Sequence, residues 1–413
     1  MAPPLPHVPG RDTYMSQLSR AAISLPLAPA PLPSPSMPAF GSVYTVIRNH
    51  LALPELPLDL YRPILAHLRG DQKALRRCAL VNRNMYAEAM ILLYERIEFS
   101  STAKIVSFVE GMKPDIGRRV RALCFRIDIS KQSVVYGALL KLLSSLTELT
   151  ELKASLRASD MYGVVQYGAM LLDCPSDKLV TFEWDSMYSA PVRDFISRQN
   201  KLEDLAISDG TMVVGRHDEF PADRLTHLRR ITGDARWITQ LAKGRPIESV
   251  VVTRTSLSAT SEMLRVLSNS RGPCTSLASP ISSALSGLYP GDVLEVARWL
   301  PNLVELGDCY LYDPYTMAPT AFFLALQGLT SLQKLRVVDN SDWEGGKFDV
   351  PDAQKIHQAV PTLRALDVIS MAHTSTRSFV RRDVEIHGGR ATLFNYVWTE
   401  HVERNRLSTH PRP

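Results

Sequence analysis

Large aliphatic residues recur along most of the chain in short segments of the form Leu-x-x-Leu-x-x-Leu. The clearest copies are LTELTEL, LTHLRRI, LPNLVEL, LTSLQKLRV and VPTLRALDV. With looser copies included, the central apolar residues are Leu123, Leu152, Phe182, Leu205, Ile231, Val250, Leu277, Leu306, Leu335 and Leu366. Successive central residues lie 29, 30, 23, 26, 19, 27, 29, 29 and 31 positions apart. The chain therefore contains an internal repeat of variable length.

The segments between these copies follow a helical period. Leu139, Leu140 and Leu143 precede one copy at helical spacing, and Ile356 and Val360 lead into another. Each unit is therefore predicted to be a helix followed by a short strand. Such spacing is typical of leucine-rich repeats, so residues 100–375 are predicted to form an α/β fold, an irregular solenoid with parallel strands on the concave face and helices outside. The alternative is an ordinary α/β domain, which the repeated leucine spacing disfavours.

A different pattern precedes the repeats and predicts a helical module at residues 51–99. Leu60, Ile64 and Leu68 recur at four-residue spacing and would form one apolar stripe on a first helix. Pro57 suits the first turn of that helix, where a missing N–H costs nothing, and Gly70 suits its end.

Two more short helices are predicted in this module. One begins after Asp71 as N-cap and runs to about Leu80. The next runs from about Met85 to Leu93 and places apolar residues on one face. Three helices of this length bury too little apolar surface to be comfortably stable alone. The remaining surface either meets a partner or covers the first repeat, and the sequence leaves both possibilities open.

This module resembles an F-box, whose usual wording is roughly LPxELLxxILxxL followed by a V-S/C-R-x-W stretch. The resemblance covers about a tenth of the chain and rests on Leu56, Pro57, Asp59, Leu60, Ile64, Leu65, Leu68, Leu75, Leu80, Val81, Asn82 and Arg83. It implies binding to a Skp-type adaptor and, through it, to a cullin-RING ubiquitin ligase. The residues expected to contact the adaptor or support that contact are Leu56, Pro57, Leu60, Ile64, Leu65, Leu80 and Val81.

Two features depart from the F-box pattern. Pro63 falls inside the predicted first helix, where a proline removes one hydrogen bond and costs roughly 3 kcal/mol unless the helix kinks or starts late. The usual tryptophan is absent, and Met85 and Tyr86 stand in its neighbourhood. Both departures concern the geometry of the helices more than the resemblance itself.

Composition indicates which parts of the chain are disordered and in which compartment the protein is expected. Residues 1–50 hold many of the 28 prolines and are predicted to be a disordered leader. The five cysteines are scattered without C-x-x-C spacing, which is typical of free thiols in a reducing compartment, so a cytoplasmic or nuclear location is expected. A net charge of +5 gives little reason to expect nucleic-acid binding, and no apolar run is long enough to span a membrane. Residues 376–413 are predicted to be a capping segment with a basic tail, in which acidic residues interleave with the arginines.

The sequence contains no pattern typical of a catalytic, cofactor or metal site: H-E-x-x-H, the phosphate loop, G-x-S-x-G and G-x-G-x-x-G are all missing. Aromatic residues are the stronger binding candidates. Tyr310, Tyr312 and Tyr315 follow one predicted strand and Trp343 follows the next, so they could anchor a protein target at one rim of the solenoid. Alternatively, these rings pack on each other or under a loop.

These observations give one hypothesis and two competitors. The hypothesis is a non-catalytic substrate receptor of an SCF-type ubiquitin ligase, with the helical module on the Skp adaptor and the repeats on a protein target. The first competitor is a leucine-rich-repeat scaffold with no ligase link. The second is an enzyme of unrecognised type, which would need a polar cluster converging in a deep pocket.

Overall fold

The computed structural model describes residues 57–128, 133–157, 166–209, 220–221, 223–254, 257–279, 287–311, 319–339, 350–370, 375–380, 384–386 and 389–391. The chain divides into two units, Met1–Pro57 and Leu58–Pro413, and the described helices and strands all belong to the second. The predicted disordered leader lies outside the described residues.

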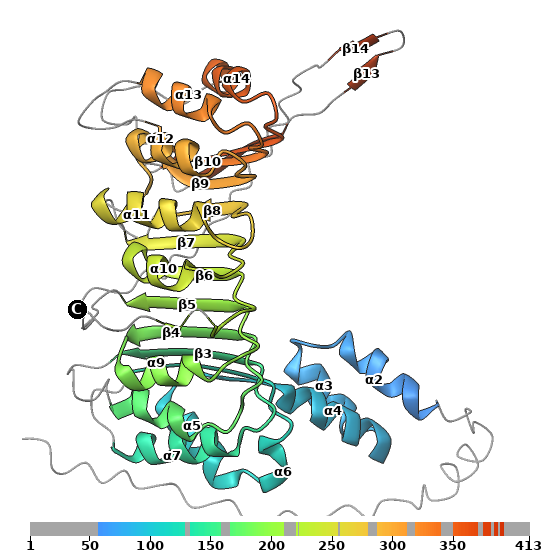
Figure 1. The fold of residues 1–413 in the computed structure, drawn as a ribbon. Coiled ribbons are helices and arrows are strands. Elements are labelled where there is room, and N and C mark those ends of the chain that lie inside the picture. Colours follow the sequence, from blue (N-terminus) through green and yellow to red (C-terminus); the bar gives the residue numbers. More distant parts are fainter. Residues whose placement is uncertain are drawn as a thin grey trace, which may run out of the picture. The chain divides into compact units, whose positions relative to one another are not determined.

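One sheet organises the second unit, and its strands follow each other in chain order (Figure 1). The strands are β1 (Arg96–Phe99), β2 (Ala122–Asp128), β3 (Glu151–Arg157), β4 (Thr181–Met187), β5 (Asp204–Asp209), β6 (Arg230–Asp234), β7 (Ser249–Arg254), β8 (Ser276–Ala278), β9 (Glu305–Tyr310), β10 (Lys334–Asp339), β11 (Ala365–Ser370) and β12 (Ser375–Val380). From β1 to β11 the neighbours are parallel, whereas β12 is antiparallel to β11. We call β1 to β12 the repeat sheet.

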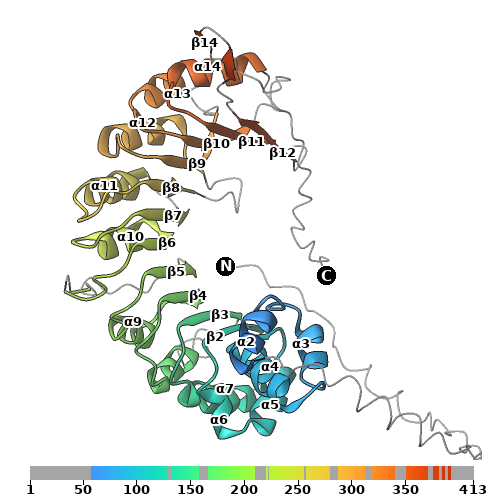
Figure 2. The ribbon, with the colours of Figure 1, turned by 90° about the vertical axis from the view of Figure 1, so that its right-hand side faces the viewer.

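Helices connect most successive strands and lie outside the repeat sheet. They are α5 (Thr102–Gly111), α6 (Pro114–Gly117), α7 (Ser133–Ser145), the 3-10 helix η2 (Met170–Asp173), α9 (Ala190–Ser197), α10 (Ala235–Ala242), α11 (Leu257–Ser268), α12 (Pro290–Trp299), α13 (Pro319–Gln327) and α14 (Val350–Ala359). Figure 2 shows α9 to α13 on one side of the strands. The predicted α/β solenoid of parallel strands with outer helices is therefore confirmed. A separate hairpin, β13 (Val384–Ile386) with β14 (Gly389–Ala391), follows the repeat sheet.

The repeat spacing read from the sequence matches the strand register. Each of the ten predicted central residues pairs with the next across neighbouring strands, from Leu123 opposite Leu152 to Leu335 opposite Leu366. All ten are buried in one continuous core. The row begins one strand earlier than predicted, because Ile97 of β1 pairs with Leu123. This first strand lies inside the range 51–99 that was expected to be helical.

Backbone hydrogen bonds join consecutive repeats where the strands β3 to β11 begin. The N–H groups of two consecutive residues donate to one carbonyl of the preceding repeat, as Val304 and Glu305 do to Thr275, at 2.9 Å each. The same junction occurs nine times in succession, from the carbonyl of Arg121 to that of Gln333. Because it uses only backbone atoms, it tolerates any donor residue except proline, which has no N–H. That explains how repeats of unequal length and composition keep one register.

Candidate partner-binding surface on the three-helix module

Three short helices precede the repeat sheet, and we call them the three-helix module. They are α2 (Leu58–Ala66), α3 (Gln72–Cys78) and α4 (Arg83–Glu95). The first helix begins at Leu58, directly after Pro57, which was expected inside its first turn. It continues through Pro63, which has no N–H to donate to the carbonyl of Asp59. Tighter turn hydrogen bonds follow the helix, and the chain reverses at Gly70, whose φ of 97° favours glycine.

Side-chain caps fix the starts of the other two helices. The carboxylate of Asp71 accepts a hydrogen bond from the N–H of Ala74 at 2.9 Å, which confirms the predicted N-cap. The side chain of Asn82 accepts from the N–H of Met85 at 2.8 Å, so α4 begins two residues before its predicted start. Sequence reasoning missed this cap, although asparagine is a preferred N-cap residue and was a usable signal. The Asn82 cap borders the short turn that carries Leu80 and Val81.

The module has a small core of its own, distinct from that of the repeat sheet. Four buried side chains form it: Leu65, Leu75, Ala89 and Leu92. Leu65 is only 1% exposed. It was grouped with the residues that contact or support the adaptor, and its burial leaves it the supporting role alone. The helical period explains this, because Leu65 lies about 100° around the helix from Ile64 and points inward.

Large apolar side chains remain exposed around this core. The exposed fractions are 42% for Leu60, 46% for Ile64, 86% for Leu80, 65% for Val81 and 51% for Tyr86. Among the described residues, the repeat region is far longer but exposes only three such side chains: Val134, Leu294 and Leu324. Exposed apolar residues concentrated in one small region are typical of an interaction surface.

These residues form two groups by their place on the helices. Leu60 and Ile64 are one helical turn apart and share a face of α2. Leu80 and Val81 lie in the turn between α3 and α4, where the N–H of each donates to a carbonyl of the last turn of α3. Tyr86 follows on the first turn of α4 and was noted from the sequence only as a departure from the expected tryptophan. Pro57 is exposed, and Leu56 lies outside the described residues.

The aromatic residues proposed as target anchors have a different outcome. Tyr310 is 3% exposed, and its ring stacks on that of Tyr289 with the centroids 5.0 Å apart. The prediction that Tyr310 is an exposed anchor is therefore wrong, and the alternative of packing on another ring holds for it. Gly287 makes room for this ring, because a Cβ there would lie 2.3 Å from a Tyr310 ring carbon. Tyr312, Tyr315 and Trp343 lie outside the described residues.

Other chemistry is sparse in the part of the chain that the structure describes. No group of three or more His, Cys, Asp or Glu side chains is placed to hold a metal ion there. All five cysteines are free thiols, and burial raises the pKa of Cys274 to about 12, which keeps that thiol protonated and unreactive at neutral pH. Within the described ranges, no helix is both long and apolar enough to cross a membrane.

Comparisons with known proteins give limited matches. No family model matches the chain. The chain is similar to an F-box protein, COS111 from Candida glabrata, with 37% identity over 79 residues. That match covers 19% of this chain and only 8% of the yeast protein. A solved internalin from Listeria monocytogenes aligns over 76% of this chain and 85% of its own, at 15% identity and a TM-score of 0.33.

Proposed function

We propose that this protein is a non-catalytic substrate receptor of an SCF-type ubiquitin ligase. In this role the three-helix module binds a Skp-type adaptor, the adaptor connects to the cullin complex, and the repeat region binds a protein target. The partial match to an F-box protein and the F-box resemblance of Leu60, Ile64, Leu80 and Val81 support the first part. The parallel sheet with outer helices is an architecture that presents an extended binding surface, which supports the second.

The single observation that carries the proposal is the exposure of Leu60, Ile64, Leu80 and Val81 beside a core of only four buried side chains. Burying one such side chain fully contributes about 1.5–3 kcal/mol relative to leaving it in water. A partner that covers all four would therefore gain substantially from contact with this module. The chain would make and break no bonds itself, and would act by raising the effective concentration of a bound target near the ubiquitin donor.

A paired charge substitution tests the adaptor contact. We expect Leu60→Asp with Ile64→Asp to abolish co-purification of a Skp-type adaptor with the full chain, because a carboxylate on each exposed position cannot be buried without a large desolvation cost. The matched control is Val134→Asp with Leu294→Asp, which places the same charges on similarly exposed apolar positions of α7 and α12. This control should retain the adaptor. Circular dichroism establishes that both variants are folded, and retention of the adaptor by the first would contradict the proposal.

The alternative function is a leucine-rich-repeat scaffold that binds proteins without any ligase link. In that case the exposed side chains of the three-helix module would serve another partner. The discriminating observation is whether native pull-downs of the unmodified chain contain a Skp-type adaptor and a cullin. Mass spectrometry of the proteins retained by the unmodified chain and by the variant with Leu60→Asp and Ile64→Asp answers this and also identifies candidate targets of the repeat region.

A further inference from the structure

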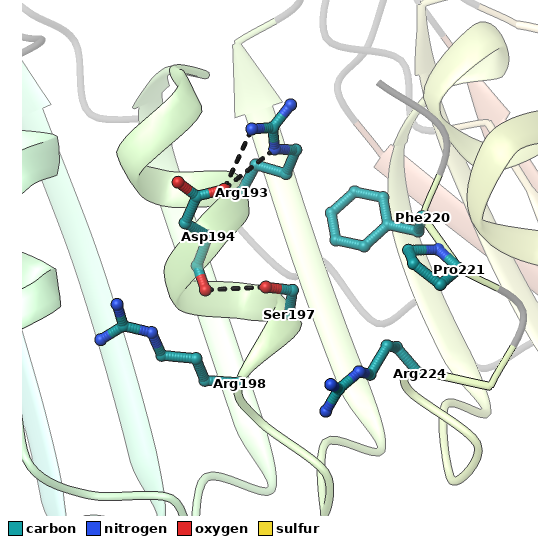
Figure 3. Close-up of a pocket in the computed structure, with 7 residues that line it drawn as sticks. All are labelled: Arg193, Asp194, Ser197, Arg198, Phe220, Pro221 and Arg224. Carbon is teal, nitrogen blue, oxygen red and sulfur yellow. Dashed lines mark hydrogen bonds and ion pairs between the residues drawn. The ribbon is translucent and has the colours of Figure 1, made fainter. Parts of the chain in front are cut away.

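A pocket of about 380 Å³ opens between α9 and the short segment that precedes β6 (Figure 3). Three arginines contribute to its lining together with one carboxylate, and the full lining is Arg193, Asp194, Ser197, Arg198, Phe220, Pro221 and Arg224. Figure 3 shows Arg198 and Arg224 on either side of Ser197, with the guanidinium group of Arg198 directed away from Arg224. The pocket is therefore basic, and we call it the arginine pocket.

The three guanidinium groups differ in whether an acidic side chain already pairs with them. Arg193 donates two hydrogen bonds to one carboxylate oxygen of Asp194, at 3.1 and 3.0 Å. Arg198 donates to the backbone carbonyl of Leu172 at 3.3 Å, which engages a neutral group and leaves the charge unbalanced. Arg224 is exposed, and its side chain has no hydrogen bond or ion pair with any described residue. Arg198 and Arg224, which both contribute to the lining, thus lack an acidic partner among the described residues.

The segment with Pro221 and Arg224 forms one wall of the pocket, and a buried arginine outside the pocket lining holds it in place. Arg245 is fully buried, and its guanidinium donates to the carbonyls of Arg224 at 2.9 Å and Pro221 at 2.8 Å. It also donates to the carbonyl of Leu241 at 2.6 Å, at the end of α10. A cation is favourable there, because the C-terminal end of a helix carries partial negative charge. Arg245 therefore ties the pocket wall to α10 without entering the pocket.

The backbone of this wall also departs from an ordinary loop. Leu225 has a φ of 56°, a left-handed conformation that a bulky residue rarely adopts. Its side chain is buried in the repeat core, so the surrounding structure determines this conformation. Strained backbone of this kind persists only where neighbouring contacts hold it and is frequent at binding sites. The backbone of the wall is thus fixed, and the exposed side chain of Arg224 extends from it.

We propose that the arginine pocket binds an oxyanion, a phosphate or a carboxylate, carried on a segment of a protein partner. The planar guanidinium fork matches both groups and can engage either with two hydrogen bonds. The hydroxyl of Ser197 already donates to the backbone carbonyl of Asp194 at 2.8 Å, so the guanidinium groups would supply the donors to the oxyanion. Phe220 with Pro221 adds an apolar wall against which a neighbouring side chain of the partner can pack. The proposal rests on the protein-binding role of the repeat region but is independent of the adaptor.

The test uses the full chain and three immobilised peptide libraries with degenerate flanks around a fixed central residue: phosphoserine, glutamate or serine. We expect retention on the phosphoserine or the glutamate library, or on both, to exceed that on the serine library by about tenfold, since charge-assisted hydrogen bonds are the stronger kind. Comparison of the first two libraries tells which oxyanion the pocket prefers. Equal retention on all three libraries would overturn the proposal.

Variants assign the binding to this pocket. Arg198→Glu with Arg224→Glu should abolish the preference, whereas the control Arg265→Glu with Arg271→Glu, which makes the same charge change at exposed positions elsewhere, should keep it. Arg198→Lys with Arg224→Lys should restore charge but not the bidentate geometry, and give intermediate retention. An equal loss in the control, or stronger binding of a single-stranded RNA oligonucleotide lost in the same variant, would overturn the proposal. Adaptor co-purification should be unchanged in the first variant, which separates this proposal from the ligase assignment.

Discussion

The three-helix module and the repeat sheet differ in how completely they bury their apolar side chains. The repeat sheet buries its leucines in a continuous core and places ion pairs across its strands, such as Arg230 with Asp204 at 3.1 Å and Lys153 with Glu183 at 3.9 Å. The core of the module holds four side chains, and other large apolar side chains, such as Leu80, remain in water. The repeat sheet therefore meets its own packing requirement, whereas the module has apolar surface available to a partner.

The largest expected effect concerns the core of the repeat sheet. Leu335→Ala should lower the free energy of unfolding by about 2–5 kcal/mol, because the side chain is buried and its loss leaves a cavity. Denaturant unfolding of the full chain measures it. Leu324→Ala, at an exposed position of α13, is the control and should change the free energy by less than about 0.5 kcal/mol. A loss below that figure for Leu335→Ala would show that Leu335 contributes nothing to a packed core.

A smaller loss is expected where the repeat region depends on a buried charge. Arg245→Met should destabilise the protein by about 1–3 kcal/mol, because the carbonyls of Pro221, Arg224 and Leu241 lose their donor. It should also raise the hydrogen-exchange rates of residues 223–225 while those of β10 stay unchanged. Unaltered exchange at residues 223–225 would contradict the role given to Arg245.

Within the three-helix module the largest local effect should come from its caps. Asp71→Ala should cost about 0.5–2 kcal/mol of local stability, because the N–H of Ala74 loses its acceptor. Hydrogen exchange of α3 measures the loss, and Asp71→Asn, which keeps an acceptor oxygen, should restore most of it. If the asparagine variant behaves like the alanine variant, the side-chain cap does not stabilise this helix.

The smallest expected effect sharpens the comparison most. Leu80→Ser should change the free energy of unfolding by less than about 0.5 kcal/mol, because the side chain is 86% exposed and supports no core. The same substitution should weaken adaptor binding several-fold, since an exposed apolar contact would be lost. Titration of both proteins with the adaptor measures this. A variant with lower stability and unchanged affinity for the adaptor would show that Leu80 supports the fold and not the contact.

The sequence predicted the repeat sheet well for a physical reason. Every central residue from Leu123 to Leu366 must be buried, and that requirement leaves a visible period of aliphatic residues. The first strand escaped because it is only four residues long, RIEF, with Ile97 and Phe99 as its buried positions. The hydrogen-bonded junctions between repeats could not be predicted from the sequence, because backbone groups form them.

Sites depend on tertiary contacts and were less predictable. Exposure of Leu60 and Ile64 agrees with the expected adaptor surface, while burial of Leu65 follows from the rotation of the helix. Tyr310 was misplaced because its strand buries residues on both faces. The arginine pocket joins residues 193–198 to residues 220–224, and no short sequence pattern reports such a meeting.

Hydrogen exchange of the full chain, alone and with a Skp-type adaptor, tests the central claim most directly. The account predicts slower exchange in α2, in the turn at Leu80 and Val81 and in the first turn of α4, with no change in β6 to β8. Unchanged exchange throughout the three-helix module in the presence of saturating adaptor, or protection confined to the repeat sheet, would contradict it.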